Sequence, residues 1–265
     1  MNFTEGEYIY INKPYGMTSF GALAFVRTRV SRKVGVRRVK IGHAGTLDPL
    51  ATGVLILCTG KKTKEIERLQ LDSKEYTATL QLGATTPSYD MEHEVDATYP
   101  TAHITREAIE QVLAGFVGDI QQVPPQYSAC KIDGDRAYKL KRKGEEVQLT
   151  AKTVHIDAIE LTGFDAEKML LSIRVSCGKG TYIRSLARDI GRALQSGAYL
   201  TALCRTRLGS VRISDCITLD DFPQWLDSQE IEVPESSGKS GKTGTTKQEI
   251  RNNDIRRHET ITVQI

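Results

Sequence analysis

The segment with the densest potential for chemistry is GHAGTLDPLATGVL, residues 42–55, where glycines surround a single acid, Asp48. Glycines allow tight turns and close approach of the backbone to a ligand. A carboxylate in such a loop can act as a nucleophile at an electrophilic sugar or base carbon. Spacing alone nevertheless favours a plainer interpretation, in which Asp48 is a helix N-cap and Pro49 is the first helical residue.

A nucleophilic carboxylate must stay ionised, so it needs a cation beside it. One candidate is Arg184, which follows a Gly-Lys-Gly turn. Apolar residues recur at helical spacing from about 181 to 194 and predict a helix. Arg184, Arg188 and Arg192 are spaced by four along its other face, where a solvated surface would also place arginines. Spacing does not establish a contact between Arg184 and Asp48.

The elements that must position these residues mix helix and strand patterns. Apolar or alternating runs predict strands over residues 54–58, 75–82 and 171–177, and threonine-capped periodic runs predict helices over residues 18–30 and 105–116. Because no regular βαβ alternation links them, we expect an α+β domain over residues 1–222, built on a mixed sheet.

The charge of the chain is unevenly distributed. The net charge of +3 is too small to indicate nucleic-acid binding by itself. From Arg27 to Lys40, however, seven positive charges occur without an acid. This pattern fits a solvated loop and a phosphate-tracking surface equally well. A second basic segment, residues 136–143, predicts a short helix.

Several classes of protein are disfavoured. The longest apolar run has five residues, far below the roughly 20 of a membrane-spanning helix, and no secretory signal is visible. Five cysteines without C-x-x-C spacing and five scattered histidines argue against a disulfide framework or a metal site and fit the cytoplasm. Three Gly-Lys look-alikes, at Gly60, Gly238 and Gly241, lack the first glycine of a phosphate-binding loop.

The C-terminal residues differ in composition from the rest. Residues 236–247 contain only serine, glycine, lysine and threonine, which predicts a flexible stretch inside a short extension over residues 223–265.

Several long motifs together resemble one family, the TruB-type tRNA pseudouridine synthases, which isomerise uridine 55 in the T-loop of tRNA. The similarity covers nearly all of residues 9–222. It rests on Asn12-Lys13-Pro14 with Thr18-Ser19, GHAGTLDPLATGVL at 42–55, Glu75-Tyr76, VPPQYSACKIDGDRAYKLKRKGE at 123–145, RVSCGKGTYIRSLARDIG at 174–191 and LCRTRLGS at 203–210.

The resemblance implies catalytic roles for three residues. Asp48 would be the nucleophile, Arg184 would pair with it, and Tyr76 would stack on the target uracil. It also implies a pseudouridine-synthase fold, with a largely antiparallel mixed sheet and flanking helices. Without the resemblance, Tyr76 would be assigned to the core and Arg184 to the surface.

Four further residues would bind substrate if the resemblance holds. His43 would enter the space vacated by flipped bases, Tyr182 and Leu203 would line the uridine pocket, and Lys131 would contact phosphate or support the pocket. Packing or turn roles are the plainer interpretations. The expected partner is the tRNA T-stem-loop. We expect a monomer with no cofactor, no metal, no membrane contact and no obligatory protein partner.

Longer bacterial members of this family carry a C-terminal PUA-like domain. Only about 43 residues follow Phe222, so a full domain of that kind is not expected here. The shortness of the chain also disfavours the dyskerin-like branch, which needs guide RNA and protein partners.

Two other functions stay open at the level of sequence. A non-catalytic RNA-binding or tRNA-folding protein would use the same basic segments and pocket. A nucleoside hydrolase would also use a carboxylate, usually one of a pair, but no second matched acid stands out. The set of Asp48, Tyr76 and Arg184 favours the synthase, because a simple binder has no use for an ionised acid facing RNA.

Overall fold

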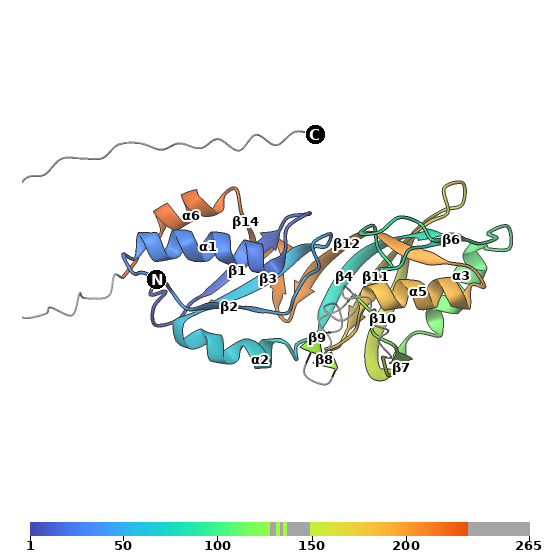
Figure 1. The fold of residues 1–265 in the computed structure, drawn as a ribbon, viewed down its shortest axis with the longest axis horizontal. Coiled ribbons are helices and arrows are strands. Elements are labelled where there is room, and N and C mark those ends of the chain that lie inside the picture. Colours follow the sequence, from blue (N-terminus) through green and yellow to red (C-terminus); the bar gives the residue numbers. More distant parts are fainter. Residues whose placement is uncertain (128–130, 133–134, 137–148, 233–265) are drawn as a thin grey trace, which may run out of the picture. The chain divides into compact units, whose positions relative to one another are not determined.

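The computed structural model describes residues 1–127, 131–132, 135–136 and 149–232, which belong to one compact unit, Met1–Pro234. Its backbone is a ten-stranded sheet in the order β14-β1-β3-β12-β4-β11-β10-β7, with β13 beside β12 and β2 beside β3 (Figure 1). The strands are β1 (Tyr8–Lys13), β2 (Ile41–Ala44), β3 (Thr52–Thr59), β4 (Lys74–Leu82), β7 (Gly118–Gln122), β10 (Lys152–Asp165), β11 (Leu170–Cys177), β12 (Ala198–Leu208), β13 (Val211–Arg212) and β14 (Ile217–Thr218). Two pairs, β1–β14 and β3–β12, are parallel and the others antiparallel, so the predicted α+β class with a mixed, largely antiparallel sheet is confirmed.

Helices flank this sheet. They are α1 (Ser19–Lys33), α2 (Ile66–Leu69), α3 (Arg106–Ala114), α5 (Ile183–Ala193) and α6 (Phe222–Ser228), with 3₁₀ turns at Gly60–Glu65 and Ile213–Asp215. Two short antiparallel pairs stand apart from the sheet: β5 (Ala84–Thr85) with β6 (Ala97–Thr98), and β8 (Lys131–Ile132) with β9 (Asp135–Arg136).

Helix α1 forms where the sequence predicts it. The Thr18 hydroxyl accepts a hydrogen bond from the Gly21 amide at 2.9 Å and caps the first turn. Val26 and Val30, on the helix's inner side, are fully buried in a core that also contains Ile11 of β1 and phenylalanine side chains from both ends of the unit. This packing fixes α1 against the β1–β3 half of the sheet.

Helices α3 and α5 cover the other half of the sheet, over a second core that includes Leu80, Ile173 and Leu186. The interpretation of the α5 arginines as a solvated face is wrong for two of the three. Arg184 is 4% exposed and Arg188 is 6% exposed, because the loops that follow β5 and β7 fold over that side and accept their hydrogen bonds.

The two halves meet where β3 and β12 pair over only two positions, Thr52 with Cys204 and Gly53 with Arg205. Gly53 has a φ of +102°, and a Cβ there would lie 2.2 Å from the Arg205 carbonyl oxygen. Only glycine fits this position. The segment that leaves the sheet just before this junction carries Asp48.

Substituting Gly53 by alanine should destabilise the protein more than the same change at Gly118. Both glycines have a left-handed φ, +102° and +97°, but nothing lies within 4 Å of a Cβ at Gly118. The clash at Gly53 should cost about 1–3 kcal/mol beyond the shared backbone strain. Thermal unfolding of both variants measures the difference, and equal losses would contradict the close approach of β3 and β12.

Some predictions from the sequence are wrong or stay untested. Asp48 does not cap a helix, because residues 48–51 form a turn closed by the Ala51 amide and the Asp48 carbonyl. The helix predicted over 136–143 and the stretch 236–247 lie outside the described residues, apart from Arg136 in β9. Phe222 and Leu226 of α6 are buried in the α1 core; the domain boundary at 222 stays a prediction. No helix in the described part of the chain is long and apolar enough to cross a bilayer.

Candidate active site

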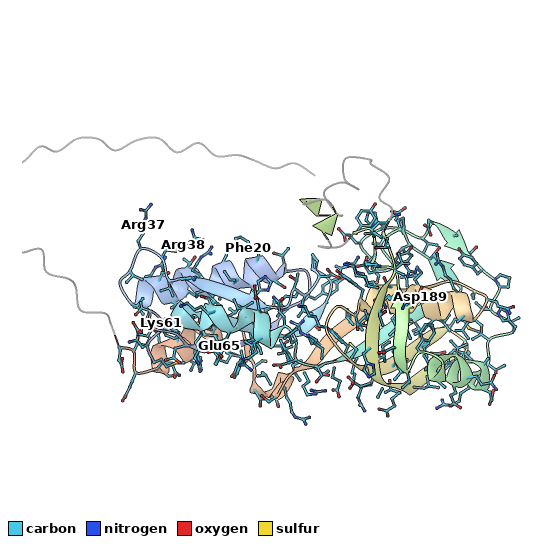
Figure 2. All side chains as sticks on the ribbon, turned by 90° about the horizontal axis from the view of Figure 1, so that it is seen from below. Phe20, Arg37, Arg38, Lys61, Glu65 and Asp189 are labelled. Atoms are coloured by element: carbon cyan, nitrogen blue, oxygen red, sulfur yellow. The ribbon has the colours of Figure 1, made fainter. Side chains whose placement is uncertain are left out.

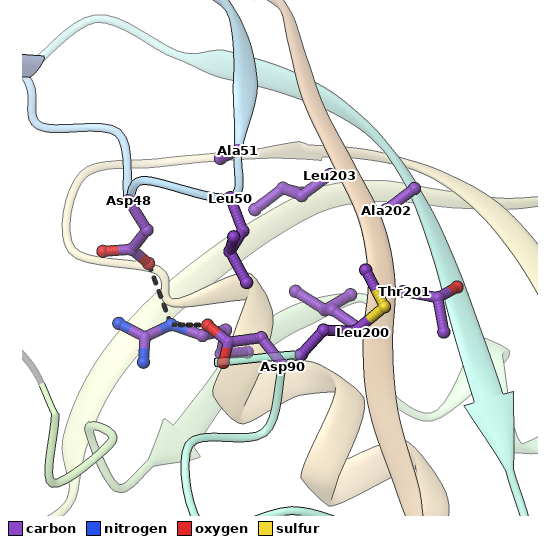
Figure 3. Close-up of a pocket in the computed structure, with 10 residues that line it drawn as sticks. Asp48, Leu50, Ala51, Asp90, Leu200, Thr201, Ala202 and Leu203 are labelled. Carbon is purple, nitrogen blue, oxygen red and sulfur yellow. Dashed lines mark ion pairs between the residues drawn. The ribbon is translucent and has the colours of Figure 1, made fainter. Parts of the chain in front are cut away.

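An ion pair joins the two residues that sequence reasoning singled out first. Asp48 lies in the loop between β2 and β3, and Arg184 is the second residue of α5. Arg184 Nε is 2.8 Å from Asp48 Oδ2 (Figure 3). The arginine side chain is 5% exposed and the aspartate side chain 41% exposed. A buried guanidinium thus holds a carboxylate that remains open to a ligand.

Backbone carbonyls fix the orientation of Arg184. Its Nη1 donates to the Ser88 carbonyl at 3.2 Å and its Nη2 to the Tyr127 carbonyl at 2.9 Å. The planar guanidinium donates in several directions at once, so these bonds leave Nε directed at Asp48. The position of the carboxylate therefore depends on two loops distant in sequence.

A second acid, Asp90, also contacts Arg184, with its Oδ2 3.6 Å from Nε. Figure 3 draws the two ion pairs that one guanidinium makes with Asp48 and Asp90. Sequence reasoning missed Asp90, a second acid that contacts Arg184. Its side chain is only 9% exposed, against 41% for Asp48, and it balances the buried charge of Arg184 at the edge of a smaller hollow that both acids line.

The Asp48 loop is bound to the segment that precedes α1. Lys13 is fully buried, and its Nζ donates to the carbonyls of Pro14, Met17 and Pro49 at 2.8, 2.6 and 3.3 Å. Burial lowers the pKa of Lys13 to about 8, against the attraction of Asp48. Sequence reasoning noted Lys13 in a motif without giving it a role. In the structure it fastens the loop that carries the nucleophile candidate.

Arg205 lies beneath the same loop from the side of β12. It is 1% exposed, and it donates to the Val54 carbonyl at 2.8 Å and to the Gly45 carbonyl at 3.1 Å. It lies opposite Tyr76 in the β4–β12 register. Sequence reasoning missed Arg205, although it is two residues from Leu203 and thus shares its side of the strand.

Five of the expected residues line one hollow, of about 1150 Å³ including its open mouth. They are Asp48, Tyr76, Tyr182, Arg184 and Leu203. Burial raises the pKa of the Tyr76 phenol, which keeps the ring neutral, and the side chain is 8% exposed. A smaller hollow of about 290 Å³ shares Asp48, Arg184 and Leu203 and is otherwise mostly apolar (Figure 3). The ion pair therefore borders both spaces.

The remaining two expected residues are not gathered into this hollow. His43 lies in β2, half-buried, and is not among the described residues that line either space. Burial and the charge of Arg205 lower the pKa of His43, so its ring is neutral near pH 7. Lys131 lies in β8, and its side chain falls outside what the structure describes. Their roles stay predictions.

The arrangement can hold a flat ring beside a carboxylate. Two tyrosines supply aromatic surface, Arg184 supplies the charge that an ionised Asp48 needs, and Lys179 adds positive charge at the same hollow. Among the described residues, no group of three or more histidine, cysteine, aspartate or glutamate side chains is arranged to hold a metal ion.

Two family models match adjoining parts of the chain. The model for the TruB family pseudouridylate synthase N-terminal domain covers residues 32–183. The model for the tRNA pseudouridylate synthase B C-terminal domain covers residues 184–235.

Curated relatives named tRNA pseudouridine synthase B match most of the chain. The protein from Bacteroides thetaiotaomicron is 61% identical over 239 residues, which are 89% of this chain and 100% of the relative. The Flavobacterium johnsoniae protein is 45% identical over 225 residues, covering 84% of this chain and 97% of the relative.

Among solved structures, the chain is similar to one described as a Cbf5-Nop10-Gar1 complex. The TM-score is 0.62 at 28% identity, over 84% of this chain and 55% of that chain. The present chain thus spans about half the length of that solved protein.

Proposed function

Since the chain belongs to the TruB family of pseudouridylate synthases, we propose that it isomerises uridine 55 in the T-loop of tRNA to pseudouridine. The observation that carries this proposal is the exposed Asp48 carboxylate, held 2.8 Å from buried Arg184 at a hollow shared with Tyr76 and Tyr182. A carboxylate, a fixed cation and aromatic surface are the groups that the reaction requires.

The target base must first leave its stack, because the reacting atoms of a stacked uridine are out of reach. Extrusion costs a few kcal/mol. Stacking on an aromatic side chain returns about 1–3 kcal/mol per base. Tyr76 is the stacking residue in this proposal, with Tyr182 and Leu203 completing the walls. The neutral His43 ring fills space vacated in the RNA.

The isomerisation exchanges one glycosidic bond for another. Asp48 attacks the ribose or the base, and the bond between N1 and C1′ breaks. The uracil turns within the hollow, a bond forms between C5 and C1′, and the bond between Asp48 and the substrate breaks, which restores the carboxylate. The C5 hydrogen leaves as a proton, and N1 gains a proton. No electron is gained or lost overall, and the group stays on the same molecule, so the reaction needs no redox cofactor.

The ion pair gives the Asp48 carboxylate its direction. Arg184 contacts Oδ2, and within the described residues no partner binds Oδ1, which is the oxygen free to attack. The bonds from Arg184 to two carbonyls are formed without substrate, so the cation beside Asp48 is already oriented when the tRNA binds. In this proposal the protein acts on tRNA in the cytoplasm, as a monomer without an obligatory protein partner.

Release of tritium tests the proposal, because the C5 hydrogen is lost only when pseudouridine forms. A tRNA transcript labelled with tritium at uracil C5 should release one equivalent of label to water at complete turnover. Tight binding of the transcript without release would contradict catalysis and support a non-catalytic tRNA-folding protein. Release of free uracil would instead indicate a nucleoside hydrolase.

A further inference from the structure

The outer side of α1 carries an exposed aromatic ring and a group of arginines that the site above does not use. Phe20 is 62% exposed, and the Arg27 guanidinium lies 5.7 Å from its ring centroid. Arg32, Arg37 and Arg38 follow along the chain, all exposed. Figure 2 labels Phe20, Arg37 and Arg38 along the side of the molecule that α1 forms.

Among the described residues, no acid pairs with the arginines of this surface. Four arginines, Arg27, Arg32, Arg37 and Arg38, line a shallow groove whose other lining residues are Thr28, Ser31 and Val36. Within the described residues, none of the four makes an ion pair, whereas Lys33 beside them binds Asp227 at 2.7 Å. A groove lined by one sign of charge attracts a polyanion.

The first residue of α1 is tied to the loop that carries Asp48. Ser19, the first residue of α1, exchanges two hydrogen bonds with the backbone of Leu47, the residue before Asp48. Phe20 comes next in the helix, and Arg32 follows twelve residues later. At a rise of 1.5 Å per residue, Phe20 and Arg32 are about 18 Å apart along the helix axis.

We propose that the outer face of α1, together with the loop that follows it, is a second contact surface for the substrate tRNA. Phe20 stacks on an unpaired base outside the catalytic hollow, while Arg27, Arg32, Arg37 and Arg38 bind backbone phosphates. Guanidinium groups suit phosphate because they donate two parallel hydrogen bonds. This inference rests on the proposed function for the identity of the RNA.

The salt dependence of tRNA binding tests the arginines. Each lost phosphate contact should lower the slope of log K against log salt by about 0.7–0.9. The triple variant Arg32→Gln/Arg37→Gln/Arg38→Gln should therefore lose about two to three units of slope and bind an unmodified tRNA transcript more weakly at low salt. The protein is used as the full chain, and thermal unfolding checks that both it and the control below remain folded.

A matched control removes the same charge elsewhere. Arg106, Lys168 and Arg174 are each paired with an acid, Glu110, Asp165 and Glu160 respectively. Their triple replacement by glutamine changes the net charge equally, and we expect it to leave the salt slope near the wild-type value. Equal salt slopes for the wild-type protein and the triple variant at Arg32, Arg37 and Arg38 would overturn the proposal. Equal losses of slope in both triple variants would also overturn it.

The aromatic part is tested by Phe20→Leu, which keeps an apolar side chain but removes the ring. Its affinity for the tRNA transcript should fall about five-fold or more. Val117→Ala, another exposed apolar position at 49%, should bind as wild type does. Unchanged binding by Phe20→Leu would refute stacking. Binding is read separately from tritium release, so inactivity of the wild-type protein would count against the proposed function and not against this surface.

Discussion

Replacing Asp48 by asparagine should abolish pseudouridine formation, by at least about 10⁴-fold, while leaving tRNA affinity within a few-fold of wild type. Asparagine has nearly the same shape, and its amide oxygen can still accept from Arg184 Nε, now 2.8 Å from Oδ2. It lacks the negative charge that makes the carboxylate a nucleophile. Binding is retained because the rest of the hollow is unchanged.

The measurement for Asp48→Asn is a single-turnover assay with enzyme in excess over tRNA, alongside direct binding. The control is Asp220→Asn, which removes the same charge from an exposed position beside α6. It should react at the wild-type rate. Product formation by Asp48→Asn at a rate close to wild type would refute the assignment of Asp48 as nucleophile.

Arg184→Lys should lower the rate of the chemical step about 10²-fold or more, although it keeps the positive charge. Arg184 contacts Asp48 and donates to the carbonyls of Ser88 and Tyr127 from three different nitrogens. A single lysine ammonium cannot reproduce this arrangement of three donors. The substitution leaves carbonyl oxygens without a donor, and each lost hydrogen bond costs about 1–3 kcal/mol. Asp48 would then lose its fixed direction.

Rates at saturating tRNA separate this effect from binding, and thermal unfolding reports the accompanying loss of stability. Arg192→Lys is the matched control, since Arg192 lies two turns further along α5 and is exposed. Arg192→Lys should leave both the rate at saturating tRNA and the midpoint of thermal unfolding unchanged. An Arg184→Lys protein with the wild-type rate would show that the ion pair has no part in catalysis.

Local patterns in the sequence predicted the elements that are formed by local interactions. Residues 75–82 alternate strictly, and β4 has the same alternation of buried and half-buried positions. The cap at Thr105 is confirmed, because its hydroxyl accepts from the Ala108 amide at 3.2 Å. Propensity, capping and periodicity act within a few residues, so one segment contains the whole signal.

The residues around the site could not be predicted in the same way, because their contacts join distant segments. Asp90 lies in a loop, where the sequence has no periodic pattern. Arg205 lies in a strand, where a charged side chain normally points to solvent. Both become recognisable only when β12 and the loop after β5 converge on Asp48 and Arg184. Spacing also gave Asp48 the wrong local structure, since its dipeptide with proline fits a helix start that the tethered loop prevents.

Mapping the product in a tRNA transcript tests most directly whether this site isomerises uridine 55. The wild-type protein should place one pseudouridine at position 55 and none elsewhere, and a transcript with cytidine at position 55 should remain unmodified. Pseudouridine at another uridine, or a bound transcript with no pseudouridine at all, would contradict the account.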